Sequence, residues 1–200
     1  MSGNTGRFAM AGATKALVTI LLMSGVAQAQ AQVDLTPVPS TYDLDGVKMS
    51  NVLFRNGREQ IAYCPPQGWR LSGGGTQLTL VPPDAPNADA QLEVKVLAAA
   101  LPFDEANLKK YVDNAKLSIP RESRNVEILG TQINPLKICG HDTLAVQLTY
   151  EAFGVSFRTH QLYLNGNEGQ QWVFRFTAPA TAFEKNYEPF RASLYSLTGL

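Results

Sequence analysis

The hydrophobic pattern of this chain changes period twice, and that change restricts the fold it can adopt. From residue 143 to 150, in TLAVQLTY, apolar and polar side chains alternate, which is typical of a strand with one buried face. Between residues 104 and 119 the apolar positions instead recur every three to four residues, as on one face of a helix; they are Leu108, Tyr111, Val112, Ala115 and Ile119. Strand-like segments lie on both sides of this helix. The sequence therefore predicts an α+β fold, an antiparallel β-sheet with helices packed on it.

Other segments extend this prediction toward both ends of the chain. The meander at the centre of the sheet is expected to consist of residues 143–150, 155–164 and 170–177. Before the helix, Asn56-Gly57 stands between two strand-like segments and indicates a hairpin. Near the C-terminus, helical spacing connects Phe183, Tyr187, Phe190, Leu194 and Leu197. Because proline favours the first turn of a helix, we expect this last helix to begin near Pro189 after a looser turn.

The stretch YCPPQGWRLSGGG, residues 63–75, could be mistaken for a functional site. A glycine run can cradle phosphate, but such a loop leads into a helix N-terminus, whereas this one leads into the strand-like TQLTLV. Cys64 carries no signature of a catalytic nucleophile. We therefore interpret this stretch as a corner between strands, with Trp69 filling part of the core.

The N-terminal 31 residues have the pattern of a secretory signal peptide. Arg7 and Lys15 are basic, residues 16–27 are mostly apolar, and alanines follow at positions 27, 29 and 31. The apolar stretch is too short to span a bilayer, which takes about 20 residues. The alternative is an uncleaved N-terminal anchor. With cleavage, residues 32–44 would be an extended leader and residues 45–200 a single domain, periplasmic or secreted.

The net charge of the chain argues against a nucleic-acid-binding protein. Loss of Arg7 and Lys15 would leave 15 basic and 17 acidic residues, a net charge of −2, which does not suit nucleic acid. No second apolar span follows, so the mature chain is predicted to have no membrane span.

Cys64 and Cys139 are the two cysteines, and an oxidising compartment would allow a disulfide between them. The alternatives are two free buried thiols or a metal pair that lacks other ligands.

The order of these elements resembles the Mog1/PsbP-like superfamily, in particular exported bacterial proteins of the PsbP or DUF1795 type. The resemblance extends over about residues 45–198. It rests on core and turn residues and on one helix; these are residues 66–69, 78–82, 138–140 and 171–176, the helix from Phe103, and Phe183, Phe190 and Ser196. It implies an α/β/α sandwich and an accessory or binding role, such as a subunit docked on a photosynthetic complex or a partner of a small GTPase. The signal peptide argues against the GTPase role. The resemblance supplies no catalytic motif.

One face of the predicted meander is a candidate binding site. If its three strands are neighbours, alternating polar positions gather on one face; they are Gln147, Thr149, Arg158, His160 and Arg175. Two arginines beside a histidine match a carboxylate or a phosphate, so a small anionic ligand is predicted there. The alternatives are a solvated face, or arginines paired with acids such as Glu93 and Glu151. The opposite, buried face would then hold Leu144, Val146, Leu148, Tyr150, Phe157, Trp172, Phe174 and Phe176.

These observations predict an exported, non-catalytic binding or accessory protein that acts on a protein complex or a small ligand in the cell envelope. Its partner would be a protein or a small anion. We assign no catalytic residue, metal or cofactor, because the sequence lacks G-x-S-x-G, H-E-x-x-H and C-x-x-C patterns. Two alternatives remain: a hydrolase of unknown class and a structural subunit of an envelope complex.

Overall fold

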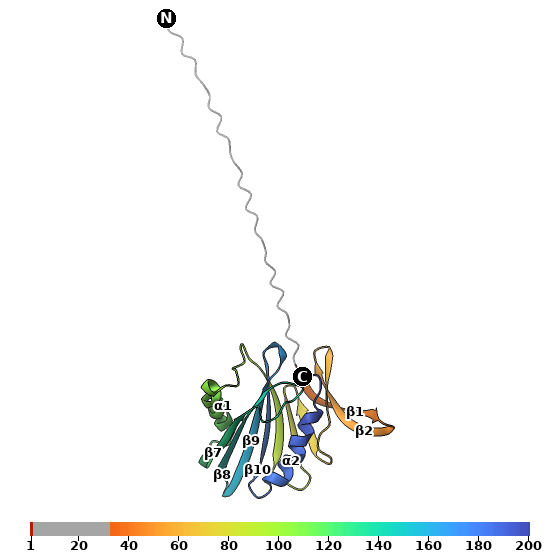
Figure 1. The fold of residues 1–200 in the computed structure, drawn as a ribbon, viewed down its shortest axis with the longest axis vertical. Coiled ribbons are helices and arrows are strands. Elements are labelled where there is room, and N and C mark those ends of the chain that lie inside the picture. The colour runs from red at the N-terminus through yellow and green to blue at the C-terminus, as the bar shows by residue number, and fades with distance from the viewer. Residues whose placement is uncertain (2–32) are drawn as a thin grey trace.

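The computed structural model describes Met1 and residues 33–200 (Figure 1). Apart from Met1, the signal peptide predicted for residues 1–31 lies outside the described residues and stays a prediction. Among the residues described, none of the helices has the length and apolar character that a membrane span needs.

The described residues form two antiparallel sheets and two α-helices. The smaller sheet has the order β1-β2-β3, with β1 at Val33–Leu44, β2 at Val47–Asn56 and β3 at Glu59–Tyr63. The larger sheet has the order β4-β5-β6-β10-β9-β8-β7; its strands are β4 (Arg70–Gly74), β5 (Gln77–Val81), β6 (Asp89–Val96), β7 (Arg124–Ile133), β8 (Thr143–Ala152), β9 (Val155–Asn165) and β10 (Gln170–Pro179). The helices are α1 (Glu105–Leu117) and α2 (Phe183–Ser193). The predicted α+β class is confirmed, and β8, β9 and β10 form the predicted meander.

The two helices cover opposite faces of the larger sheet. Tyr111 and Ala115 of α1 belong to a core cluster with the odd-numbered positions of β9 and β10, such as Tyr163 and Val173. Phe183 of α2 belongs to a second cluster with the even-numbered positions, which include Trp172, Phe174 and Phe176. The smaller sheet contributes to this second cluster through residues such as Leu35, Phe54 and Ile61. The central strands are therefore buried on both faces.

The segment expected to be a leader is strand β1. It is extended, but it pairs with β2 from Val33 opposite Asn56 to Leu44 opposite Val47, so it belongs to the fold and the expected boundary at residue 45 needs correction. Asp45 and Gly46 connect the two strands with φ angles of 52° and 81°, as in a type I′ hairpin turn. The prolines of β1 are compatible with a strand at the edge of its sheet. The outer half of this hairpin projects from the body of the protein (Figure 1), and we call Val38–Asn51 the arm.

The last helix begins earlier than predicted. It starts at Phe183, and Pro189 lies inside it and not at its first turn. A proline inside a helix removes one backbone hydrogen bond. The apolar stripe compensates for this loss, because Phe183 packs edge-on against Phe176 at a centroid distance of 5.3 Å and Phe190 is also buried.

The stretch at residues 63–75 is a corner, as predicted. Strand β3 ends at Tyr63, the chain turns through Pro65 and Pro66, and β4 begins at Arg70. The glycine run belongs to the β4–β5 hairpin, where Gly74 pairs with Gln77 and no helix follows. Trp69 is buried and stacks on Phe190, with 6.4 Å between ring centroids.

The disulfide that the sequence allowed is not formed. Cys64 and Cys139 are both free thiols. The Cys139 thiol instead donates to the carbonyl of Leu197 at 2.8 Å, and the Cys64 backbone N–H donates to Ser196 Oγ at 2.8 Å. Both cysteines thus hold the segment after α2 through separate hydrogen bonds.

Trp69→Ala should destabilise the protein strongly, because it empties the space between Phe176 and Phe190. For a buried tryptophan the expected loss in the free energy of unfolding is about 3–5 kcal/mol. Chemical denaturation followed by circular dichroism measures it. Phe153→Ala is the control, because Phe153 is 89% exposed at the β8–β9 turn and its loss should cost no more than about 0.5 kcal/mol. Equal losses for the two variants would contradict the core role of Trp69.

Candidate functional site

The register of the meander divides the predicted binding residues between two faces. Gln147 lies opposite His160, and Thr149 lies opposite Arg158, so these four side chains share a face. Arg175 lies opposite Gln161 on β9, whereas its neighbour Phe176 lies opposite His160. The two arginines therefore point to opposite faces, and the predicted site that combines them is wrong.

The error comes from the burial of both faces of β10. The alternation of apolar and polar residues predicts Trp172, Phe174 and Phe176 on the face of Leu144, if one face of the sheet is buried and the other is polar. The structure places these three aromatic residues on the face of His160, under α2. A strand that is covered on both sides carries apolar residues at successive positions, so alternation no longer identifies its faces.

Arg158 finds its counter-charge inside the protein. Its guanidinium pairs with Glu184 of α2 at 2.5 Å and donates to Gln147 Oε1 at 3.3 Å. The same group lies over the ring of Phe183, 4.7 Å from its centroid. The partner of Arg158 is Glu184 and not Glu93 or Glu151, but it is an acid of the protein itself, as the alternative to an anion site predicted. Arg158 thus attaches α2 to the sheet.

His160 lies beneath α2 and is shielded from solvent. It is 8% exposed, and its ring meets Tyr187 edge-on at 4.7 Å. Burial lowers the pKa of His160 to about 4, and the positive charges of Arg158 and Arg191 lower it further in the same direction. Its Nε2 atom has no hydrogen-bond partner. The imidazole is therefore neutral at physiological pH and acts as a packing group.

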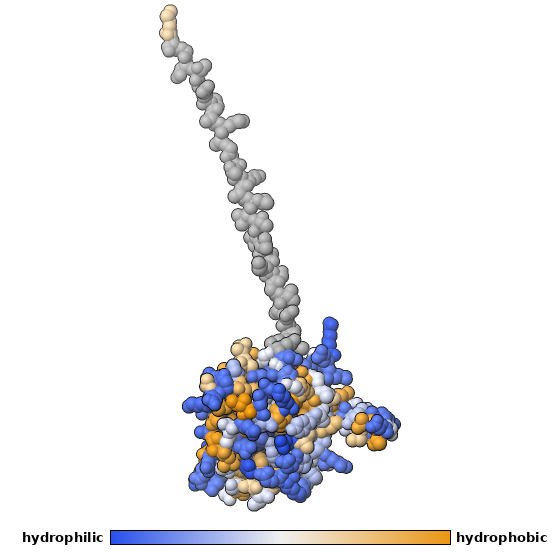
Figure 2. Space-filling model, in the orientation of Figure 1, coloured by the Kyte–Doolittle hydropathy of each residue, from blue (hydrophilic) through white to orange (hydrophobic). Residues whose placement is uncertain are grey.

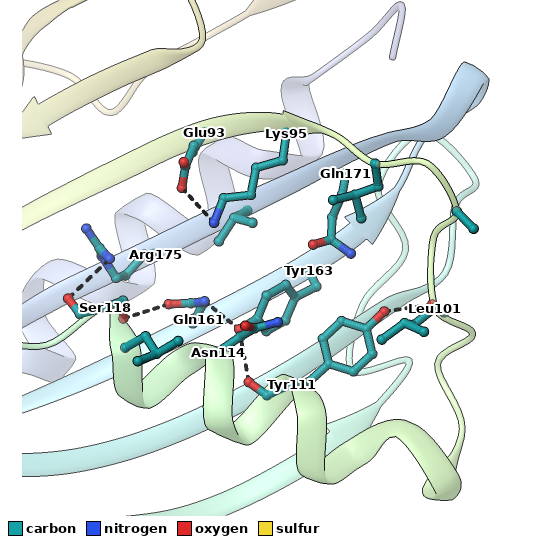
Figure 3. Close-up of a pocket in the computed structure, with 14 residues that line it drawn as sticks. Glu93, Lys95, Leu101, Tyr111, Asn114, Ser118, Gln161, Tyr163, Gln171 and Arg175 are labelled. Atoms are coloured by element: carbon teal, nitrogen blue, oxygen red, sulfur yellow. Dashed lines mark hydrogen bonds and ion pairs between the residues drawn. The ribbon is translucent and has the colours of Figure 1, made fainter.

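Arg175 lines a cavity on the other face, between α1 and the sheet. The cavity has a volume of about 510 Å³. Its lining residues come from β6, β9, β10, α1 and the loop between β6 and α1; they are Glu93, Lys95, Leu97, Ala99, Leu101, Tyr111, Asn114, Leu117, Ser118, Gln161, Tyr163, Gln171, Val173 and Arg175. Figure 3 shows side chains of the strands and of α1 facing one another across this space. We call it the α1 cavity.

A chain of hydrogen bonds fixes the floor of the α1 cavity. Ser118 Oγ lies 3.0 Å from Gln161 Oε1, and Gln161 Nε2 donates to the Tyr163 hydroxyl at 2.6 Å (Figure 3). That hydroxyl donates to the backbone carbonyl of Tyr111 at 3.1 Å. Gln161 and Tyr163 are almost fully buried. Burial raises the pKa of the Tyr163 phenol, so it stays protonated and serves as a rigid donor and acceptor.

The charged residues that line the α1 cavity lie on strands β6 and β10. Lys95 pairs with Glu93 at 3.3 Å, and both side chains are partly exposed. Arg175 donates to the backbone carbonyl of Ser118 at 3.4 Å and to Gln91 Oε1. These two acceptors of Arg175 are uncharged. A guanidinium has five N–H donors, and the described residues accept from it in these two hydrogen bonds.

Sequence reasoning identified Arg175 but missed the other polar residues of the α1 cavity. Gln161, Tyr163, Gln171 and Arg175 occupy odd-numbered positions of β9 and β10, which place them on one face. The available signal was the presence of polar residues in strands that are otherwise apolar, since a buried polar group has to be hydrogen-bonded. The contributions of Lys95 and of α1 depend on tertiary packing.

His160→Phe should weaken the dependence of stability on pH. Because the pKa of His160 is lowered to about 4 from 6.5, the unfolded chain binds the proton more readily between these values. Stability is therefore complete above pH 6.5 and falls as the pH drops toward 4, by up to about 3 kcal/mol. The phenylalanine variant should lose this part of the slope, as measured by urea denaturation across that pH range. His141→Phe is the control and should keep it; identical slopes in both variants would contradict the assignment.

Comparisons with known proteins support the fold. No protein-family model and no curated protein matches the chain. Among solved structures, it is similar to the Ran-binding protein Mog1p of Saccharomyces cerevisiae, with 12% identity and a TM-score of 0.50 over 82% of this chain and 96% of that chain. It is also similar to cyanobacterial PsbP from Synechocystis, with 10% identity and a TM-score of 0.48 over 90% of this chain and 99% of that one.

A third similar structure is LpqN of Mycobacterium tuberculosis, which is involved in cell envelope biogenesis; it has 13% identity and a TM-score of 0.47 over 83% of this chain and 90% of that one. At such low identity, the likeness to Mog1p establishes the fold alone. This chain has a fold like that of Mog1p, and the α1 cavity is its candidate functional site.

Proposed function

We propose that this protein is an exported, non-catalytic binding protein of the cell envelope that holds a small organic anion in the α1 cavity. The observation that carries the proposal is the environment of Arg175, a cavity-lining cation whose hydrogen-bond acceptors are the uncharged oxygens of Ser118 and Gln91. An arginine in this state favours a carboxylate, which it can bind with two parallel hydrogen bonds.

The balance of charge in the α1 cavity supports an anion. Its lining side chains carry two cations, Lys95 and Arg175, and one carboxylate, Glu93, which pairs with Lys95. The nearby Asp89 accepts from Gln91 at 2.9 Å and not from Arg175. Burial raises the pKa of Asp89 and the Arg175 charge acts to lower it, so the two groups interact, but the described residues give Arg175 no direct ion pair. An incoming carboxylate would supply that pair.

The shape of the α1 cavity supports a ligand with an apolar body. Its volume lies within the range of 300–1,000 Å³ that is usual for small-molecule sites. Leu97, Leu101 and Val173 add apolar surface beside the polar floor. A small carboxylate with a hydrocarbon or aromatic body would satisfy Arg175 and cover this surface.

The chemistry of the lining residues supports binding without turnover. A hydrolase that works by covalent catalysis needs a nucleophile with a base beside it. The lining residues that the structure describes include no cysteine and no histidine, and burial raises the pKa of both Tyr111 and Tyr163. Mog1p shows that a protein of this fold can be a binding protein, since it binds Ran. Both observations favour a binding or accessory role over the hydrolase alternative.

Export can be tested directly on the protein from its source cells. Removal of the predicted signal peptide should give a mature chain that starts at Gln30 or Gln32, because small alanine residues precede both positions. N-terminal sequencing of the envelope fraction measures this. A chain that still begins at Met1 would contradict cleavage.

Arg175→Gln should abolish ligand binding in the α1 cavity while leaving the protein folded. We would screen small carboxylates, such as succinate, benzoate and hexanoate, by thermal shift at low salt. A ligand at 100 times its Kd should stabilise the wild type by about 2.7 kcal/mol, and the variant should lose this gain. Arg158→Gln is the matched control. It lies on the opposite face, so it should keep the ligand response, although loss of its contacts with Glu184, Gln147 and Phe183 should lower stability by about 1–3 kcal/mol.

Other outcomes of the screen would favour the alternatives. If no carboxylate stabilises the wild type, or if both arginine variants respond as the wild type does, the small-anion proposal fails and a structural subunit is favoured. Release of product from ester analogues of the bound carboxylates, followed by chromatography, would favour the hydrolase.

A further inference from the structure

The arm exposes a continuous apolar face. Tyr42 lies opposite Met49 and Leu44 lies opposite Val47, so these four side chains share one face of the β1–β2 ribbon. Their exposed fractions are 38%, 40%, 53% and 59%, respectively. Figure 2 shows hydrophobic residues on the projecting arm, away from the body of the protein. An isolated two-stranded ribbon is only marginally stable in water, so an exposed apolar face of this kind indicates a binding surface.

The outer half of β2 also has an unpaired edge. Strand β3 pairs with β2 only from Asn56 opposite Glu59 to Val52 opposite Tyr63. Pro65 and Pro66 then turn the chain away. Residues 47–51 of β2 are left with β1 as their single neighbouring strand. Half of the backbone groups of such an edge point outward, and they can pair with an added strand.

A groove runs along this unpaired edge. It has a volume of about 620 Å³ and lies between the arm and the corner that follows β3. Its lining residues are Pro39, Tyr42, Lys48, Met49, Ser50, Asn51, Val52, Cys64, Pro65, Pro66, Gln67, Gly68 and Trp69. The Tyr42 hydroxyl lies 3.7 Å from Cys64 Sγ, so the apolar face of the arm faces the corner. We call this space the arm groove.

Two polar groups in the arm groove lack a partner among the described residues. Asn51 Oδ1 is buried and accepts no hydrogen bond, which is costly unless a donor arrives. Lys48 is the one charged residue among those that line the groove, and the described residues give it no ion pair. Asp43, its cross-strand neighbour, instead accepts from the Gly46 backbone N–H at 2.8 Å. A donor for Asn51 Oδ1 and an acid for Lys48 are therefore both missing along the outer half of β2.

We propose that the arm groove binds an extended segment of a partner protein, which adds a strand to β2 beside residues 47–51 and continues the line of β3. Its backbone pairs with the free edge, as in other cases of strand addition. One of its N–H groups satisfies Asn51 Oδ1. Its alternate side chains are apolar and cover Met49 and the proline corner, and an acidic side chain pairs with Lys48. The arm groove shares no lining residue with the α1 cavity.

The test uses a defined peptide and the mature chain. The probe is acetyl-Thr-Val-Glu-Val-Thr-Val-amide, together with the set in which the glutamate occupies each of the six positions. Hydrogen exchange should show new protection of the amides of residues 47–51 for at least one peptide of the set. The same peptide with alternate backbone nitrogens methylated keeps its side chains and loses its donors, so it should give no protection.

Two variants test the side-chain contacts. Lys48→Glu should weaken binding of the glutamate peptide about fivefold, measured by fluorescence polarisation with a labelled peptide. Met49→Asp should weaken it about tenfold, because it removes apolar contact on the arm face. Leu129→Asp is the matched control. Leu129 is 47% exposed on β7, at the edge of the larger sheet, and its change should leave binding unaltered.

Three results would overturn the proposal. One is the absence of protection at residues 47–51 with every peptide of the set. Another is a concentration-dependent dimer in sedimentation experiments that Met49→Asp abolishes, which would assign the arm to a second copy of the chain. The last is binding to phosphatidylglycerol vesicles that Met49→Asp abolishes without any peptide protection, which would assign the arm to a lipid surface.

Discussion

The central strands β9 and β10 carry apolar side chains on both faces, so the larger sheet needs a cover on each side. Helix α2 and the smaller sheet close one face, through an aromatic cluster that includes Trp69, Phe176 and Phe183. Helix α1 closes part of the other face, through Tyr111 and Ala115. The two faces are covered to different extents, and the candidate site on the larger sheet follows from that difference. Helix α2 covers His160 and pairs with Arg158 through Glu184, so both residues make their contacts inside the protein.

The second cover is partial, and the α1 cavity is its consequence. Helix α1 contributes to a cluster with β8 and β9, while the side chains of β6 that face the same way are polar. Where the helix stops, Gln161 and Tyr163 form a hydrogen-bonded floor and Arg175 stands at the edge with neutral acceptors. This side of the sheet therefore places polar side chains beside an apolar cluster, a combination that suits a small carboxylate with an apolar body.

The arm has a different cause, which is the early end of strand β3 at two prolines. Pro65 and Pro66 end β3 after Tyr63, although β2 and β1 continue to the Asp45-Gly46 turn. The smaller sheet thus has three strands near the body and two at its tip. The unpaired edge, the orphan Asn51 Oδ1 and the exposed apolar face all lie on the two-stranded part. The two candidate sites therefore differ in nature, since one is a cavity beside a helix and the other is an open strand edge.

The sequence by itself determined the class of fold, the meander, the α1 helix and the corner at Trp69, because each depends on local periodicity or on turn residues. It also contained the Asp45-Gly46 signal that reveals the arm, although a proline-rich segment suggested a leader. Only the tertiary structure decided which face each residue of β10 occupies, where α2 begins and whether Cys64 meets Cys139. Register, helix burial and thiol proximity depend on residues far apart in the chain. For the same reason Arg158 and Arg175, which the sequence placed together, lie on opposite faces.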